Sequence, residues 1–272
     1  MKHIKLASGF EMPMLGLGTW KSQGNDVKNA ITIALKNKYT HIDTAWIYQN
    51  QNEIGEAIKE SGVEREKLFI TSKIWREYLN YDEALKNAEE TLKQLELDYV
   101  DLLLIHWPNK NIPMKDYLTA LKKLLDDGKA KSVGVSNFTI HHLQDALKLN
   151  IVPISVNQVE YHPYLNQKEL LQFCKDNGIA LTAYCPLARG EAVNDPLLEE
   201  IGKKYNKSAA QVSLRWLHQK DILVIPKSIT ESRIIENMNI FDFELSNEDM
   251  EKIDSLNKDY RICNFDLGEF DY

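Results

Sequence analysis

The sequence contains few cysteines, no long apolar run and no excess of positive charge. Three cysteines in 272 residues, Cys174, Cys185 and Cys263, are too few and too scattered for a disulfide framework or a zinc site, and they favour a reducing compartment. No stretch approaches the roughly 18 consecutive apolar residues of a membrane span, and the N-terminal MKHIKLASGF lacks the apolar segment of a signal peptide. The net charge of −7 disfavours non-specific nucleic-acid binding. We therefore expect a cytoplasmic, metal-free protein with neither a membrane nor a nucleic-acid partner.

The chain also lacks linkers and the common phosphate-binding fingerprints. No proline-, glycine- or serine-rich tract divides it, so we expect residues 1–272 to form a single domain. The segment LGLGTW (15–20) holds two glycines but no third, and no helix follows it directly, so it matches neither G-x-G-x-x-G nor a Walker loop. A doubly wound open sheet, the alternative architecture, would need such a fingerprint after its first strand.

Short apolar segments alternate with longer amphipathic ones along the chain. A hairpin is predicted within 5–13, around Ser8-Gly9. The pattern that follows implies a parallel sheet covered by helices, and at this length a closed (β/α)8 TIM barrel is the best solution. The predicted strands are 14–18, 41–43, 68–74, 100–106, 131–137, 154–158, 179–184 and 222–226. The predicted helices are 26–38, 52–60, 82–96, 114–128, 140–149, 167–178, 209–220 and 231–240.

Polar or aromatic side chains stand at the carboxyl ends of these strands. In a TIM barrel the catalytic groups come from this edge. The residues concerned are Asp43 with Tyr48 on the following loop, Lys73, His106 with Trp107, Ser136 with Asn137, Gln158, Tyr184, and Lys227 with Ser228. The plain alternative for Asp43 and Tyr48 is a satisfied core carboxylate and a packing tyrosine.

Four of these residues have complementary chemistry. A phenol titrates near ~10, and a nearby ammonium group lowers that value. Lys73 would do this to Tyr48 if the buried Asp43 held the lysine in place. His106 would offer a hydrogen bond to a substrate oxygen. The combination predicts a site that donates a proton to an oxyanion developing on a carbonyl.

The motifs around these residues resemble those of the aldo-keto reductase family over essentially the whole chain. Within the family, the sequence is most similar to the short-tailed bacterial 2,5-diketo-D-gluconate and methylglyoxal reductases. The motifs occur in the family's order and are LGLGTW (15–20), HIDTAWIYQNQNEIGEAI (41–58), TSKIW (71–75), LDYVDLLLIHWP (97–108), GVSNF (134–138), NQVEYHPYL (157–165), AYCPLARG (183–190) and IPKSITESRIIEN (225–237).

The resemblance implies that NADPH binds in an extended pose across the strand ends. The nicotinamide would stack on Tyr184, and the backbone around Leu187 would meet the pyrophosphate. The carboxamide would be bound by Ser136, Asn137 and Gln158. The 2′-phosphate would be bound by Lys227, Ser228, Thr230 and Arg233, with Asn237 near the adenine. Physically, helix N-terminal amides and two cations would converge on one anion; the alternative is that Lys227 and Arg233 are ordinary solvated charges.

The resemblance also implies hydride transfer to a small aldehyde or ketone, such as methylglyoxal or 2,5-diketo-D-gluconate. Tyr48 would donate the proton with help from Lys73 and Asp43, and His106 would orient the carbonyl. The substrate pocket would be lined by His106 and by Trp20, Trp75 and Trp107, for which core packing is the alternative. The family's usual monomeric state is expected.

Some features depart from the family pattern or leave alternatives open. Gln49 stands where glycine is common and Gln51 where an acid is common, and the short tail after residue 256 suggests an open pocket.

His141 and His142 are interpreted as surface residues. Two other functions stay open, a non-catalytic NADPH-binding sensor or structural protein and an unrelated barrel enzyme that uses Lys73 as a Schiff base.

Overall fold

The computed structural model describes residues 2–263, 265 and 268–270, and its centre is a parallel sheet. In this part of the chain eight strands pair in sequence order, and the first meets the last: Gly16 N donates to Val224 O at 2.9 Å, and Val224 N donates to Met14 O at 3.0 Å. The predicted (β/α)8 barrel is therefore confirmed. The strands are β3 (Leu17–Gly18), β4 (His41–Asp43), β5 (Phe69–Ile74), β6 (Val100–Ile105), β7 (Ala130–Ser136), β8 (Val156–Glu160), β9 (Ala180–Tyr184) and β10 (Leu223–Val224).

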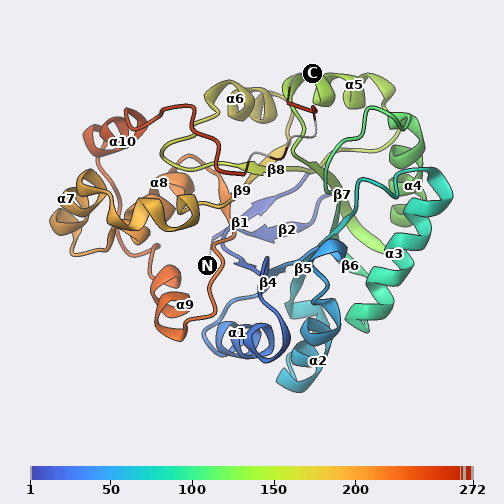
Figure 1. Cartoon of the computed structure of the whole chain (residues 1–272), viewed down its shortest axis with the longest axis horizontal. Coiled ribbons are helices and arrows are strands. Elements are labelled where there is room, and N and C mark those ends of the chain that lie inside the picture. The colour runs from blue at the N-terminus through green and yellow to red at the C-terminus, as the bar shows by residue number, and fades with distance from the viewer. Residues whose placement is uncertain (1, 264, 266–267, 271–272) are drawn as a thin grey trace.

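Helices surround this sheet on its outer side (Figure 1). Their apolar faces pack against the outward side chains of the strands in one large core. The helices are α1 (Gly24–Lys36), α2 (Gln51–Ser61), α3 (Tyr81–Leu95), α4 (Met114–Asp126), α5 (Ile140–Leu149), α6 (Lys168–Asp176), α7 (Pro196–Tyr205), α8 (Ala209–Gln219), α9 (Glu231–Met238) and α10 (Asn247–Asp254). Short 3-10 segments are η1 (Trp46–Tyr48), η2 (Arg65–Lys67) and η3 (Ala188–Asn194).

Strand alternation determines which side chains enter the barrel. In β6, Leu103 and Ile105 belong to the outer core, whereas Leu102 and Leu104 belong to a separate cluster inside the barrel. Because side chains alternate with a period of two, the next inward position after Leu104 is His106. The same rule directs Asp43 and Lys73 inward at the carboxyl ends of β4 and β5, where their side chains meet.

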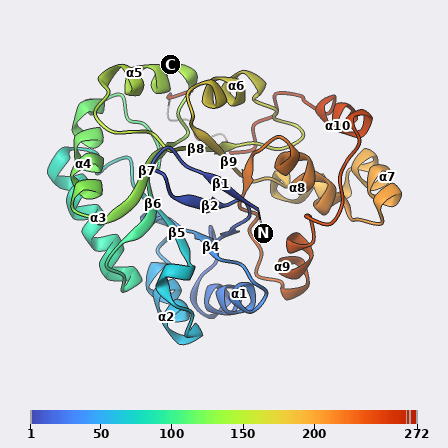
Figure 2. The same cartoon turned by 180° about the vertical axis from the view of Figure 1, so that it is seen from behind.

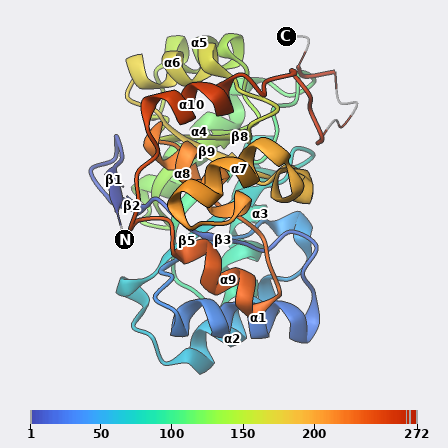
Figure 3. The same ribbon diagram turned by 90° about the vertical axis from the view of Figure 1, so that its left-hand side faces the viewer.

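An N-terminal hairpin closes the opposite end of the barrel. Strands β1 (His3–Lys5) and β2 (Glu11–Pro13) pair antiparallel, as predicted. Leu6 and Met12 from this segment pack into the inner cluster with Leu102, and the hairpin lies across the barrel when it is seen from behind (Figure 2). The hairpin and the C-terminal segment lie on opposite sides of the barrel (Figure 3). The hairpin therefore leaves the mouth at the carboxyl ends of the strands open for a functional site.

One residue assignment from the sequence is wrong. His142 is buried rather than on the surface: its ring packs beside Phe138 with centres 5.3 Å apart, and its backbone N–H and ring nitrogen form a capping box with Thr139 at the start of α5. Helix α7 lies in a region where no helix was predicted. None of the described helices is long and apolar enough to cross a membrane.

Candidate active site

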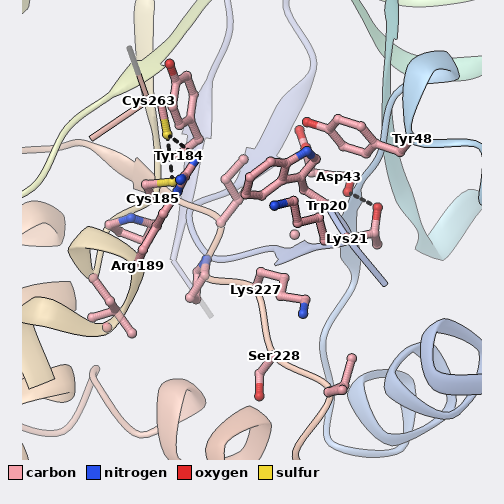
Figure 4. A pocket seen from close by; sticks show the side chains of 18 of the residues that line it. Trp20, Lys21, Asp43, Tyr48, Tyr184, Cys185, Arg189, Lys227, Ser228 and Cys263 are labelled. Atoms are coloured by element: carbon pink, nitrogen blue, oxygen red, sulfur yellow. Dashed lines mark hydrogen bonds between the residues drawn. The ribbon is translucent and has the colours of Figure 1, made fainter. Parts of the chain in front are cut away.

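A cavity of about 1260 Å³ opens at the carboxyl ends of the strands. It is lined by nearly all the residues singled out from the sequence, and Figure 4 shows Asp43 and Tyr48 on one side of it and Tyr184 on the other. Those lining it are Asp43, Tyr48, His106, Trp20, Trp75, Trp107, Asn137, Gln158, Tyr184, Leu187, Lys227, Ser228, Thr230, Arg233 and Asn237. Lys73 and Ser136 are fully enclosed behind this lining.

Asp43 holds two side chains at the base of the cavity. Lys73 Nζ donates to Asp43 Oδ1 at 2.6 Å and to the carbonyl of Thr44 at 2.7 Å, and Gln158 Nε2 donates to Asp43 Oδ2 at 2.7 Å. Burial lowers the pKa of Lys73, while the charge of Asp43 and the hydrogen bond to it act in the opposite direction. The predicted pairing of a buried carboxylate with Lys73 is thus present.

Tyr48 ends the short 3-10 segment that follows β4. Lys73 Nζ lies 5.2 Å from the centre of its ring, and Gln23 Nε2 donates to the Tyr48 carbonyl at 2.7 Å. The next residue, Gln49, has a left-handed backbone with φ of 54°, a conformation that glycine adopts without steric cost. The glycine common at this place in the family therefore has a conformational reason, and Gln49 keeps the same turn.

The expected lowering of the Tyr48 pKa is wrong. Burial, followed by the negative charge of Asp43, raises the pKa of the Tyr48 phenol well above its ordinary value of 10.0. The phenol is therefore protonated at neutral pH. A group that is to donate a proton must carry one, so this arrangement still suits an acid.

His106 faces Tyr48 and Trp75 edge-on. The ring centres are 5.6 Å from Tyr48 and 5.4 Å from Trp75. Burial, together with the charge of Lys73, lowers the pKa of His106 well below 6.5, so the imidazole is neutral. Its buried Nδ1 has no hydrogen-bond partner among the described residues. A neutral imidazole can donate one hydrogen bond from a ring nitrogen to an oxygen in the cavity.

A chain of hydrogen bonds joins the polar residues at the ends of β7, β8 and β9. The Tyr184 hydroxyl donates to Asn137 Oδ1 at 2.7 Å, and Asn137 Nδ2 donates to Ser136 Oγ at 3.1 Å. Ser136 Oγ donates to the carbonyl of Gln158 at 2.7 Å. The network fixes these groups before any ligand binds, which lowers the entropic cost of binding one.

A second charged region lies where α9 begins. Lys227 and Arg233 are exposed, and neither forms an ion pair with a carboxylate in the part of the chain that the structure describes. Ser228 Oγ accepts a hydrogen bond from Thr230 N at 3.1 Å, just before the helix. Two unpaired cations beside helix N-terminal amides are a favourable environment for a phosphate.

Sequence reasoning missed several residues of the cavity wall. Arg189 lies in the motif AYCPLARG but was not assigned a role; its guanidinium lies 4.8 Å from the centre of the Trp20 ring. Cys185, from the same motif, and Cys263 and Phe265, from the tail, also line the cavity. Trp107 packs against Phe265 with ring centres 5.8 Å apart, so the short tail still contributes to the pocket wall. Tail residues 264, 266–267 and 271–272 lie outside the described residues.

The comparisons with known proteins agree with this geometry. A model of the aldo/keto reductase family matches residues 14–258. The chain is 53% identical over 260 residues to the glyoxal reductase of Bacillus subtilis (strain 168), across 95% of this chain and 94% of that one. An aldo-keto reductase enzyme from a Medee basin deep-sea metagenome library matches with a TM-score of 0.94 and 42% identity, over 97% of each chain. An aldo-keto reductase complexed with NADPH matches with a TM-score of 0.94 and 32% identity, over 98% of this chain and 91% of that one.

The resemblance found in the motifs is thereby confirmed. The matches extend over the whole barrel and include every strand whose carboxyl end supplies a residue to the cavity. The chain belongs to the aldo/keto reductase family.

Proposed function

We propose that this protein is an NADPH-dependent reductase that converts small aldehydes and ketones to alcohols. The observation that carries the proposal is the position of Tyr48 and His106, which face one cavity while Asp43 and Lys73 pair behind them. Because the pKa of Tyr48 is raised, its phenol is protonated at neutral pH. Because the pKa of His106 is lowered, its imidazole is neutral.

The chain's own residues would bind the carbonyl and supply the proton. NADPH, when bound, supplies the hydride. His106 would donate a hydrogen bond that fixes the carbonyl oxygen, and the Tyr48 hydroxyl would give its proton to that oxygen as negative charge develops there. Lys73, held by Asp43, would place a positive charge near the phenolate that Tyr48 becomes.

The residues of the cavity fit the cofactor. The network of Ser136, Asn137 and Gln158 would bind the carboxamide beside Tyr184, with the Leu187 backbone near the pyrophosphate. The side chains at the start of α9 would bind the 2′-phosphate, and these are Lys227, Ser228, Thr230 and Arg233, with Asn237 near the adenine. A similar aldo-keto reductase has been solved in complex with NADPH, which supports this choice.

A small dicarbonyl is the favoured substrate class. The relative with 53% identity is a glyoxal reductase, and the aromatic rings of Trp20, Trp75 and Trp107 line the same cavity as His106. Methylglyoxal and keto-sugar acids such as 2,5-diketo-D-gluconate are the compounds to test. A monomeric state and a cytoplasmic location stay predictions.

Two other functions have less support. A non-catalytic NADPH-binding protein would have no chemical need for Asp43, Tyr48, Lys73 and His106 together. A Schiff-base enzyme needs an accessible, unpaired lysine, whereas the Lys73 side chain is 0% exposed and is hydrogen-bonded to Asp43. Trapping with borohydride and a carbonyl substrate would reveal a Schiff base.

The test is loss of reduced-nicotinamide absorbance with methylglyoxal, glyoxal and 2,5-diketo-D-gluconate, with NADPH or NADH. We expect turnover with NADPH and a fall in kcat of about 100-fold or more in Tyr48→Phe. Tyr260→Phe is the matched control, because the Tyr260 side chain is exposed and away from the cavity. Tight NADPH binding without turnover on any of these carbonyls would favour the non-catalytic alternative.

A further inference from the structure

Two cysteines from distant parts of the chain meet at the cavity wall. Cys185 directly follows β9 and Cys263 belongs to the C-terminal segment, yet their sulfur atoms lie 3.4 Å apart. Arg189 Nη2 donates to Cys263 Sγ, also at 3.4 Å. Figure 4 places the two thiols and Arg189 together, apart from Tyr48 and Asp43 across the cavity. Neither the hydride-transfer chemistry nor the proposed cofactor contacts use these thiols.

We propose that Cys185 and Cys263 form a redox-sensitive dithiol, which hydroperoxides oxidise to a disulfide that ties the C-terminal segment to the end of β9. The existence of this site does not depend on the proposed reductase function. The expected effect of the disulfide on cofactor exchange does rest on the proposed function, and separate experiments test the disulfide and that effect.

The surroundings of the pair favour a reactive thiol. Cys185 is partly exposed and lines the cavity, which is wide enough to admit a peroxide. A hydrogen bond from Cys263, assisted by the positive charge of Arg189, lowers the pKa of the Cys185 thiol despite its burial. The thiolate is the form that attacks peroxides. Cys185 is therefore the expected nucleophile, and Cys263 the resolving thiol.

The remaining cysteine provides an internal comparison. Cys174 is fully buried on α6, and burial raises the pKa of its thiol to about 12. It does not line the cavity. A buried, protonated thiol is inert toward peroxides, so selective oxidation of the pair over Cys174 is expected.

The oxidation balances in two steps with a hydroperoxide as the oxidant. The Cys185 thiolate attacks the O–O bond of hydrogen peroxide, forms a sulfenic acid and releases hydroxide, which takes up a proton to become water. The Cys263 thiol then attacks the sulfenic sulfur, loses its proton and releases a second water. Two thiols have been oxidised by two electrons, and one peroxide has been reduced to two waters.

The C-terminal segment is already held where a disulfide needs it. The buried carboxylate of Glu160 accepts backbone hydrogen bonds from Ile262 at 2.7 Å and Cys263 at 2.9 Å. The sulfurs have to move from 3.4 Å to the ~2 Å of a disulfide, a local adjustment of side chains and the flanking loop. No large rearrangement is needed to bring the two segments together.

The disulfide would tie the C-terminal segment to the end of β9 at the cavity wall. Cys185 lies between Tyr184 and the Leu187 loop, which line the region proposed for the cofactor, and Phe265, two residues after Cys263, packs on Trp107 in the wall of the same cavity. A covalent bond between the C-terminal segment and the end of β9 would restrict the motion that lets a large ligand enter and leave the cavity. We expect oxidation to slow NADPH association and dissociation several-fold.

The site itself is tested by mass spectrometry of the whole protein. After brief treatment with hydrogen peroxide, wild type and Cys174→Ala should each lose two hydrogen atoms in mass and yield a cross-linked peptide pair containing residues 185 and 263. A thiol reductant should reverse both changes, and Cys185→Ser should not form the cross-link. Stable sulfinic acid at either position without a cross-link, or equal oxidation of Cys174, would overturn the proposal.

The functional effect is tested by stopped-flow measurement of NADPH binding to the reduced and oxidised forms. Slower exchange that a reductant restores, and that Cys185→Ser lacks, supports the regulatory role. Unchanged exchange despite a complete cross-link refutes that role and leaves the modification site standing. Failure of both forms to bind NADPH contradicts the proposed function instead, since the mass result does not involve the cofactor.

Discussion

Asp43 Oδ1 accepts a hydrogen bond from Lys73 Nζ at 2.6 Å inside the barrel, where the two side chains are 3% and 0% exposed. Both charges are almost fully buried, so each depends mainly on the other for compensation. Removing one partner of such a pair is strongly destabilising, whereas replacing both with apolar groups of similar volume often is not. This asymmetry separates a structural role of the pair from a catalytic one.

Lys73→Met should lower the free energy of unfolding by about 3–5 kcal/mol, because it leaves the Asp43 carboxylate buried without its cation. The double variant Asp43→Leu with Lys73→Met should recover most of that stability but not the activity. Urea unfolding and steady-state kinetics on the same samples make the comparison. A double variant that regains both stability and turnover would mean that the pair acts only in folding.

Arg233→Ala and Lys227→Ala should each weaken NADPH binding by about tenfold or more, the size of one charge-assisted hydrogen bond. The effect on NADH should be small, because NADH lacks the 2′-phosphate that these exposed cations are proposed to bind. Titration by fluorescence with both cofactors provides the measurement, and Lys115→Ala on the exposed face of α4 is the control. Equal losses for the two cofactors would rule out the 2′-phosphate assignment.

Buried histidines should make the fold sensitive to mild acid. Burial lowers the pKa of His41 and of His218 from 6.5 to about 4. Because the folded pKa lies below the unfolded one, the unfolded state binds more protons between these values. Stability is therefore fully present above pH 6.5 and declines as the pH falls toward 4, by up to about 3 kcal/mol for each histidine.

Urea unfolding between about pH 7.5 and about pH 5 tests this dependence. His218→Gln should reduce the slope of the unfolding free energy against pH by the contribution of one histidine, whatever the substitution does to stability at a single pH. His3→Gln, the same change at an exposed residue, is the matched comparison. An unchanged slope in His218→Gln would show that this imidazole titrates alike in the folded and unfolded states.

The barrel and most of the site were predictable because they depend on local pattern and order. Apolar strands that alternate with amphipathic helices leave few architectures. Period-two alternation points Asp43, Lys73 and His106 into the barrel, and parallel strands bring their carboxyl ends to one mouth. Helix α7 was missed although Asp195 caps it and Pro196 stands at its first turn, a recognised start signal.

Other features depend on burial and on contacts between distant segments, which no local pattern reports. The pKa of Tyr48 is raised by burial and then by the negative charge of Asp43, and spacing along the sequence does not reveal how deeply the phenol is buried. Cys185 and Cys263 are 78 residues apart, and only the path of the C-terminal segment brings them together. His142 is buried, and its Nε2 lies 3.7 Å from Glu269 Oε2 of the C-terminal segment, a contact that the adjacent histidine pair in the sequence does not indicate.

The path of that C-terminal segment depends on Glu160, which gives a further prediction. Its fully buried carboxylate accepts hydrogen bonds from the backbone of Ile262 and Cys263 and contacts His162 Nε2 at 2.9 Å. Burial acts to raise the pKa of Glu160, but the hydrogen bonds from His162 and the two backbone groups outweigh it and leave the pKa below its ordinary value. The carboxylate is therefore ionised and binds the tail as an anion.

Glu160→Gln should loosen the tail without disrupting the barrel, because an amide keeps the shape but has one acceptor oxygen in place of two. We expect faster hydrogen exchange at the amides of Ile262 and Cys263 and slower formation of the disulfide with Cys185. Glu96→Gln, on the exposed end of α3, is the matched control. Exchange rates equal to those of wild type would mean that contacts elsewhere in the tail, such as the 2.9 Å pair of Arg76 with Glu269, hold it instead.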